Sequence, residues 1–152
     1  MTEKFIDLYR HVVSRQNAGL SMADEYDVDI LEGQEHLLNN INDEYDLVIC
    51  STLKRCRRTL EGSSLKYRYV VYTDLCREII NTNNNRFKDE PVEYIETDEM
   101  LLQRVNVFNC MLNNYWELYP RIAVIGHAYF LNTMRGGCFV FENGAKIRYK
   151  SG

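Results

Sequence analysis

Hydrophobic and polar positions alternate along this chain in short blocks that favour strands and helices in turn. Compact apolar runs predict strands over 4–9, 46–51, 69–73 and 121–126. Apolar residues at three- and four-residue spacings predict helices over 33–42, 53–62, 97–118 and 128–135. Because strands and helices alternate, we expect an α/β fold, a three-layer α/β/α sandwich around a mostly parallel central sheet.

The longest helix has the clearest pattern. Its expected buried face consists of Leu101, Leu102, Val105, Phe108, Met111, Leu112 and Tyr115. Pro120 ends this helix before the next strand. An irregular loop over 12–28 and a polar loop over 80–92 complete the expected order. At the C-terminal end, Asn143-Gly144 stands between two strand-like runs and predicts a hairpin over 138–149.

Charged and polar side chains follow the expected strands. Arg10 and His11 come directly after the first strand, His127 follows the strand that ends at Gly126, and Ser51 precedes the basic segment 54–58. Ligand sites in open parallel sheets form beyond the carboxyl ends of the strands. Cations in the first turn of a helix interact unfavourably with the helix macrodipole, so a basic first turn indicates that an anion binds there. The alternatives are a run of solvated charges and a basic interaction patch. This arrangement predicts an anion-binding pocket.

Composition narrows the class of protein. The 152 residues, 45% of them hydrophobic, suffice for one domain spanning 1–152. A formal net charge of −4 makes nucleic acid an unlikely partner. The five cysteines form no Cys-x-x-Cys pair, which argues against both a disulfide framework and a metal site and favours a reducing compartment. A polar start and the lack of any long apolar run predict a soluble, cytoplasmic protein with no membrane segment.

Five short segments, in order, resemble the motifs of the histidine phosphatase (phosphoglycerate mutase-like) superfamily. Arg10-His11-Val12-Val13-Ser14 with Asn17 is similar to the family's Arg-His-Gly-x-Ser/Thr-x-x-Asn opening. Residues 29–34 are similar to the turn that begins the family's second helix. Residues 51–59 resemble the family's Ser-x-Leu-x-Arg-Ala-x-Gln-Thr segment, and residues 76–79 resemble its Leu-x-Glu-Ile motif. Residues 126–128 resemble the family's second histidine, which is followed by glycine. The resemblance implies the phosphoglycerate mutase-like version of the expected sandwich.

The resemblance and the chemistry of these side chains together suggest a role for each. His11 is the expected nucleophile, because an imidazole can attack phosphorus and form a phosphohistidine. Arg10 and Arg55 are expected to grip the phosphoryl oxygens, and His127 to stabilise charge in the transition state. The alternative for either histidine is a structural place at a strand end.

Three further residues complete the expected site. Ser14 and Asn17 are candidate phosphate donors from the loop, although such residues also serve turns. Glu78 is the candidate general acid, which would protonate the leaving oxygen and then activate water. The alternatives are an exposed Glu78 at a loop entrance and a substitute acid such as Asp74. His36 lies among polar residues and is expected to face solvent.

The chain also departs from the family pattern. Val12 and Ala128 stand where the family usually has glycine, which would strain the backbone if those positions needed a positive φ. The short interval between Glu78 and His127 resembles the small phosphatases of the superfamily and implies an open pocket. We therefore expect a phosphatase without cofactor or metal that acts on a phosphorylated small molecule or a phosphoprotein. The alternatives are a degenerate phosphate-binding scaffold and, with less support, a phosphomutase.

Overall fold

A five-stranded sheet forms the centre of the protein, which we describe from a computed structural model over residues 3–137 and 141–152. The strands are β1 (Phe5–Arg10), β2 (Glu44–Ser51), β3 (Lys66–Thr73), β4 (Arg121–Gly126) and β5 (Lys146–Ser151). They lie in the order β3-β2-β4-β1-β5. All neighbouring pairs are parallel except β1 and β5, which are antiparallel. The prediction of a mostly parallel sheet is confirmed.

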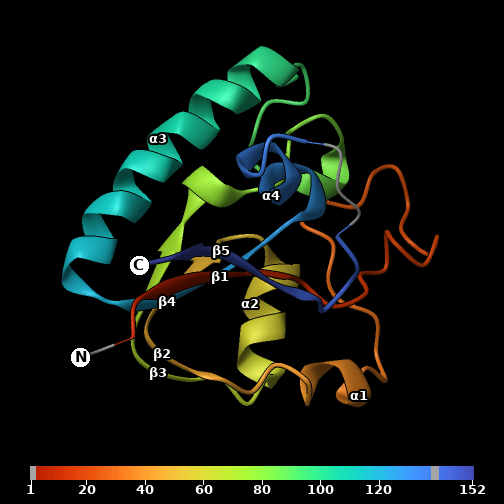
Figure 1. The fold of residues 1–152 in the computed structure, drawn as a ribbon. Helices are drawn as coiled ribbons and strands as arrows, with labels where there is room; N and C mark the ends of the chain where they lie inside the picture. The colour runs from red at the N-terminus through yellow and green to blue at the C-terminus, as the bar shows by residue number, and fades with distance from the viewer. Residues whose placement is uncertain (1–2, 138–140) are drawn as a thin grey trace.

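Helices cover both faces of this sheet. They are α1 (Glu35–Leu38), α2 (Lys54–Gly62), α3 (Asp98–Leu118) and α4 (Ala128–Met134), with short 3-10 turns η1 (Asp74–Cys76) and η2 (Asn83–Asn85). Figure 1 shows α3 and α4 above the sheet and α1 and α2 below it. Two separate apolar clusters fill the spaces between these layers. The predicted three-layer sandwich is therefore correct.

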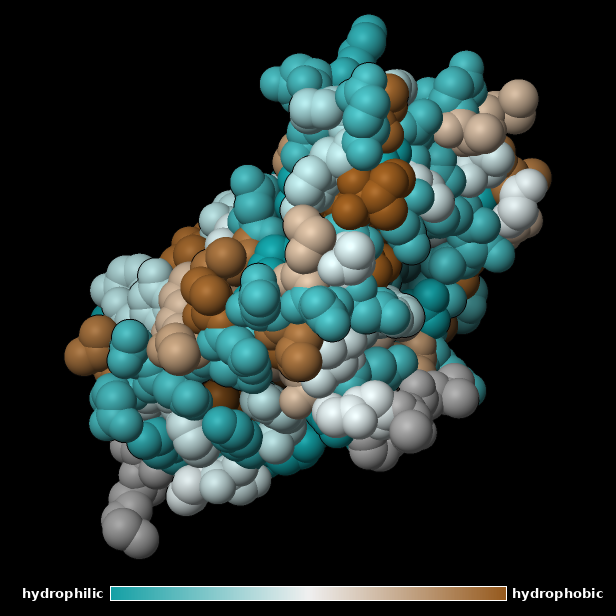
Figure 2. Space-filling model, turned by 90° about the horizontal axis from the view of Figure 1, so that it is seen from above, coloured by the Kyte–Doolittle hydropathy of each residue, from teal (hydrophilic) through white to brown (hydrophobic). Residues whose placement is uncertain are grey.

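The apolar pattern of α3 decides how the upper layer packs. Leu101, Val105, Phe108 and Leu112 are buried against the sheet, as predicted. Leu102 was expected beside them, but it is half exposed because it lies one position around the helix from Leu101. Seen from above, hydrophobic groups form several separate patches with hydrophilic residues between them (Figure 2).

Strand register places the chemistry-bearing ends side by side. Arg10 at the end of β1 is level with Gly126 at the end of β4, and Cys50 of β2 is level with Ile125 of β4. The residues that follow these three strands therefore emerge together at one edge of the sheet.

Two predicted elements differ in the structure. The helix over 33–42 is reduced to the single turn of α1, because its second half, 39–42, is rich in asparagine, which competes with helical backbone bonds. The predicted hairpin over 138–149 is observed only in its turn and its second strand. Gly144 makes the expected turn with a φ of 73°, but β5 pairs with the free edge of β1, and Phe141 and Glu142 lie in no strand. The rest of its first strand, 138–140, lies outside the described residues.

Within residues 3–137 and 141–152, no helix combines the length and the apolar character needed to cross a membrane.

Candidate active site

His11 lies immediately after β1 with both ring nitrogens engaged. Its Nδ1 is 2.6 Å from the carbonyl oxygen of Val12, and its Nε2 is 3.4 Å from Nε of Arg55. Because a carbonyl only accepts and a guanidinium only donates, the proton belongs on Nδ1 and the lone pair on Nε2. The ring is therefore held in the tautomer that a nucleophilic Nε2 requires.

His127 faces His11 across the site, with 5.3 Å between the ring centroids. It is the N-cap residue of α4 and is completely buried. Its Nε2 lies 2.9 Å from the Ser51 hydroxyl at the end of β2 and 3.4 Å from Sγ of Cys56. The ends of β1, β2 and β4 thus meet at this pair of imidazoles, as the strand-end argument predicted.

Both imidazoles are kept neutral. Burial is the main cause that lowers the pKa of His11 well below its ordinary value, and the neighbouring Arg55 and Arg10 charges add to it. Burial likewise lowers the pKa of His127, followed by the charge of Arg55 and the proximity of His11. A neutral His11 has its lone pair available at neutral pH, which is the form that attacks phosphorus.

Arg55 projects from the first turn of α2 into the site and is 2% exposed. Besides its contact with His11, its Nη2 donates to the Asn85 side-chain oxygen at 2.7 Å. Its Nη1 lies 3.5 Å from the Asn84 carbonyl oxygen. The 3-10 turn η2 therefore holds the two terminal nitrogens of the guanidinium, and the Nε atom lies next to the His11 ring.

Arg10, the last residue of β1, carries an unused donor. Its Nη1 donates to the Phe141 carbonyl oxygen at 2.6 Å, while its buried Nε has no partner among the described residues. This donor is free to bind an acceptor that enters the site. A phosphoryl oxygen is such an acceptor.

Glu78 reaches the site from the segment after β3. Its carboxylate accepts the backbone N–H groups of Tyr129 at 3.1 Å and Phe130 at 3.0 Å, in the first turn of α4. Burial raises the pKa of Glu78, and these N–H bonds and the Arg55 charge oppose the rise. The charge of Glu78 also acts on both Arg10 and Arg55. A half-buried carboxyl with a raised pKa is suited to general acid chemistry.

An ion pair that the sequence analysis did not identify holds the Glu78 segment in place. Arg104 of α3 donates to the carbonyl oxygens of Leu75 at 2.8 Å and Arg77 at 2.6 Å. It is paired with Glu96 at 2.7 Å, and Glu96 also accepts the N–H of Ile80. The available signal was the helical spacing, which places a cation at position 104 directly on the buried stripe of α3.

Ser14 and Asn17 lock the loop that follows His11. The Asn17 side-chain oxygen accepts the Ser14 hydroxyl at 2.9 Å and the Ser14 backbone N–H at 3.1 Å. It also accepts from the Asn143 amide, which donates to the His11 carbonyl oxygen as well. The structure brings both residues to the site, and in this state their polar atoms serve the turn.

A carboxylate of the protein itself lies next to the basic first turn of α2. The Asp27 carboxylate accepts the backbone N–H of Lys54 at 2.7 Å and lies 3.9 Å from Arg57. Arg58 is exposed and pairs with Asp29. Of the basic residues in this segment, Arg55 enters the site, while Arg57 and Arg58 lie near Asp27 and Asp29, as expected of residues outside it.

The two residues in place of glycine are accommodated without strain. Val12 is buried in the lower apolar cluster, and Ala128 is the first residue of α4. Within the described part of the chain, a positive φ outside glycine occurs only at Asp27, at 45°. Neither position thus needs the conformational freedom of glycine in this fold.

Among residues 3–137 and 141–152, the histidines are buried and do not line the expected open pocket. His11, Arg55 and His127 are at most 3% exposed, because the loop after β1 and the η2 turn close over them. The partly exposed members of the site are Arg10 and Glu78, which mark its accessible side.

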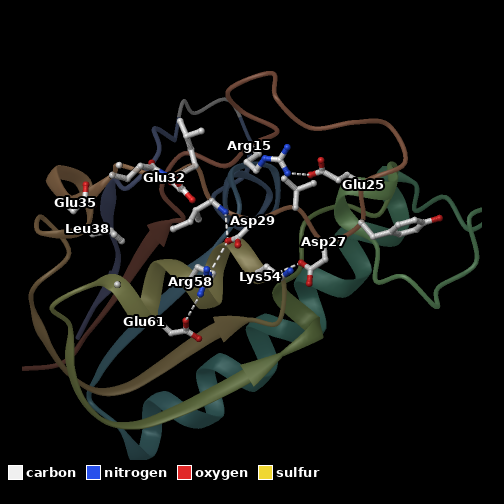
Figure 3. A pocket seen from close by; sticks show the side chains of 17 residues that line it. Arg15, Glu25, Asp27, Asp29, Glu32, Glu35, Leu38, Lys54, Arg58 and Glu61 are labelled. Atoms are coloured by element: carbon white, nitrogen blue, oxygen red, sulfur yellow. Dashed lines mark hydrogen bonds and ion pairs between the residues drawn. The ribbon is translucent and has the colours of Figure 1, made fainter.

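A hollow of about 1200 Å³ lies elsewhere, between the 25–35 segment and α2 (Figure 3). Its charged walls are largely paired with one another, through Arg15 and Glu25 and through Arg58 and Asp29. None of the predicted site residues lines it. Over residues 3–137 and 141–152, no group of three or more His, Cys, Asp or Glu side chains is arranged to hold a metal ion.

Comparison with solved structures identifies the fold. No protein-family model and no curated protein matches the chain. The alpha-ribazole phosphatase from Shigella flexneri matches with a TM-score of 0.69 and 18% identity, over 93% of this chain and 87% of that chain. Phosphoserine phosphatase from Entamoeba histolytica has a TM-score of 0.69 and 14% identity, over 99% and 96%. The mycobacterial glucosyl-3-phosphoglycerate phosphatase has 0.64 and 12%, over 94% and 89%. The chain thus has the fold of the histidine phosphatase superfamily, as the sequence resemblance predicted.

Proposed function

We propose that this protein is a phosphatase that hydrolyses phosphomonoesters or phosphorylated protein side chains through a phosphohistidine at His11. The observation that carries the proposal is the state of the His11 ring. Its Nδ1 is anchored on the Val12 carbonyl, its Nε2 lone pair faces Arg55, and burial keeps the ring neutral. The fold shared with phosphatases supports the same conclusion.

In the first step, Nε2 of His11 attacks the phosphorus atom and the bond to the leaving oxygen breaks. Glu78, whose pKa is raised by burial, gives its proton to that oxygen. The Arg55 guanidinium already lies 3.4 Å from Nε2, within reach of oxygens on the transferred group. Arg10 adds its unused Nε, and His127 stabilises the charge from the opposite side.

In the second step, water attacks the phosphohistidine and Glu78 accepts a proton from that water. The N–P bond breaks, phosphate leaves, and His11 returns to its Nδ1–H tautomer. When a phosphoryl group is bound, Ser14 and Asn17 would donate hydrogen bonds to its oxygens in place of the hydrogen bond that now joins the two side chains. Val12 and Ala128 cause no backbone strain here, which supports an active site over a degenerate scaffold.

The substrate is a phosphorylated small molecule or a phosphoprotein in this proposal, with no cofactor, no nucleic acid and no membrane involved. The described cysteines at positions 50, 56, 76 and 110 are free, which suits a reducing compartment such as the cytoplasm.

Hydrolysis of p-nitrophenyl phosphate in the presence of EDTA tests the proposal. We expect activity that resists the chelator and is lost in His11→Ala, with residue 11 found phosphorylated in rapidly quenched wild-type protein by mass spectrometry. His36→Ala is the matched control, because His36 is exposed on α1 and should leave turnover unchanged.

Three results would contradict this mechanism. They are loss of activity with EDTA, an active His11→Ala variant, and vanadate binding without any hydrolysis. The last result would identify the non-catalytic phosphate-binding alternative.

A further inference from the structure

Tyr129 is a half-exposed aromatic residue next to the general acid of the proposed reaction. It is the second residue of α4 and is 47% exposed. Its backbone N–H donates to the Glu78 carboxylate at 3.1 Å. The next residue, Phe130, also donates its backbone N–H to this carboxylate, but Phe130 is completely buried. Of these two aromatic residues, Tyr129 is therefore the one whose ring a ligand can reach.

The Tyr129 side chain is held at both ends. Its hydroxyl donates to Oδ1 of Asp98, the first residue of α3, at 2.6 Å. This hydrogen bond raises the pKa of the Tyr129 phenol, so the hydroxyl keeps its proton and remains a donor. At the other end, the backbone of Tyr129 is fixed by its bond to Glu78. A side chain held in this way loses little conformational entropy when a ligand packs against it, which favours binding.

The proposed reaction places the leaving group beside this ring. His11 and Arg55, which contact the transferred phosphoryl group in that reaction, are at most 3% exposed. Glu78, which protonates the leaving oxygen, lies on the accessible side of the site. The rest of the leaving group therefore extends from the Glu78 carboxyl toward solvent. Tyr129 is bonded to that same carboxyl, so its ring lies along this path.

The chemistry of this side chain determines which leaving group fits. The hydroxyl proton of Tyr129 is already donated to Asp98, so the side chain offers a ligand the flat apolar face of its ring. Aromatic rings pack favourably on such a face, beyond the effect of the area they bury. The Asp98 carboxylate at the hydroxyl end of the ring repels a negative charge on the leaving group.

We propose that Tyr129 is a specificity-determining residue, and that the substrates are phosphate monoesters whose leaving group is an uncharged aromatic ring. The inference rests on the proposed function, because Glu78 as the general acid is what places the leaving group at Tyr129. The Tyr129 ring stacks on the aromatic leaving group, and the steps at His11 are unchanged. A small aliphatic leaving group gains no stacking contact, and a carboxylated one is repelled by Asp98.

Calorimetric titration with phosphonates tests this inference without any turnover. Benzylphosphonate has the shape and charge of phenyl phosphate but no ester bond to hydrolyse, and methylphosphonate lacks the ring. We expect the wild type to bind benzylphosphonate roughly 3–10-fold more tightly than methylphosphonate, which is the scale of an aromatic pair. A carboxylate added to the ring of benzylphosphonate should weaken its binding, because the added charge approaches Asp98.

Three variants test whether the Tyr129 ring causes this preference. Tyr129→Ser should lose the preference for benzylphosphonate and bind methylphosphonate as the wild type does. Tyr129→Phe should keep most of the preference, because the ring remains although the bond to Asp98 is lost. Tyr67→Ser is the matched control and should change nothing. Tyr67 is 40% exposed but lies near the amino end of β3, whereas the site lies at the carboxyl ends of the strands.

Two results would overturn the inference. One is equal affinity of the wild type for benzylphosphonate and methylphosphonate, which requires no variant to fold. The other is a folded Tyr129→Ser variant that keeps the preference. Both results are compatible with an active enzyme, so they are distinguishable from a failure of the proposed function. That failure would appear as the absence of His11-dependent hydrolysis of p-nitrophenyl phosphate, and it would overturn this inference as well.

Discussion

One backbone carbonyl sets the chemistry of His11. By accepting from Nδ1, the Val12 oxygen leaves Nε2 with its lone pair and aims it at Arg55. Because a carbonyl is present in every residue, the side chain at position 12 can change from glycine to valine without affecting this bond. Val12 uses that freedom to fill the lower apolar cluster.

Arg55 is predicted to hold the phosphoryl group. Arg55→Ala should weaken vanadate binding by ~1.5–3 kcal/mol, because a charge-assisted bond is lost from a buried site. Titration of vanadate inhibition measures this loss. Arg58→Ala is the control, since Arg58 is exposed and pairs with Asp29 outside the site. Equal effects of the two substitutions would make the basic segment a surface patch.

Glu78 is predicted to act on the leaving group and not on phosphate binding. Glu78→Gln should slow the hydrolysis of alkyl phosphates by roughly 10²–10⁴-fold, because their alkoxide leaves poorly without a proton. Aryl phosphates such as p-nitrophenyl phosphate should be nearly unaffected, and vanadate affinity should not fall. Turnover numbers of wild type and Glu78→Gln on both ester types test this prediction. Equal losses on both would transfer the acid role to a neighbour such as Asp74.

At the level of elements, the sequence predicted what depends on local pattern. The strands and helices around the histidines were correct because apolar periodicity and Pro120 are local signals. The pairing of β5 with β1 was not predictable, since Asn143-Gly144 specifies a turn but not which strand edge is free. The partners of Arg104 and Asp27 were not predictable either, because both depend on contacts between segments far apart in the chain.

The start of α2 offers a prediction at this scale. Leu53 occupies the N-cap position without a side-chain cap, and the Asp27 carboxylate takes that role from the loop. Asp27→Ala should lower the free energy of unfolding by about 1–3 kcal/mol, the usual cost of a lost cap together with the cost of alanine at the positive φ of this position. Urea denaturation measures it. Asp27→Asn keeps the acceptor oxygen, so it should lose clearly less, and an equally large loss in Asp27→Asn would show that charge, not capping, is what stabilises the helix.

At the scale of the whole molecule, the site places two neutral imidazoles and the Arg55 guanidinium in an interior that the fold must keep closed. His127 is fully buried and His11 nearly so. The Arg104–Glu96 pair fixes the Glu78 segment beside α4, and Asn85 of η2 fixes Arg55. Burial lowers the pKa of each histidine, so protonation of either one in the folded protein is unfavourable. The free energy of unfolding therefore depends on pH.

The pH dependence of unfolding should reveal this coupling. Above pH 6.5, the ordinary value, His127 is neutral in both the folded and the unfolded chain, so it adds no slope. Below pH 6.5 the unfolded chain binds a proton that the folded site refuses, and stability falls by about 1.4 kcal/mol per pH unit until the lowered folded pKa is reached. His127→Asn should remove that slope.

Urea unfolding of the wild type and of His127→Asn from pH 8 to pH 5 measures this slope. Plotted against pH, the free energies of unfolding of the two proteins should run parallel above pH 7 and converge below pH 6. Curves that stay parallel throughout would mean that His127 takes up its proton in the folded protein at an ordinary pKa, and that the site is open to water.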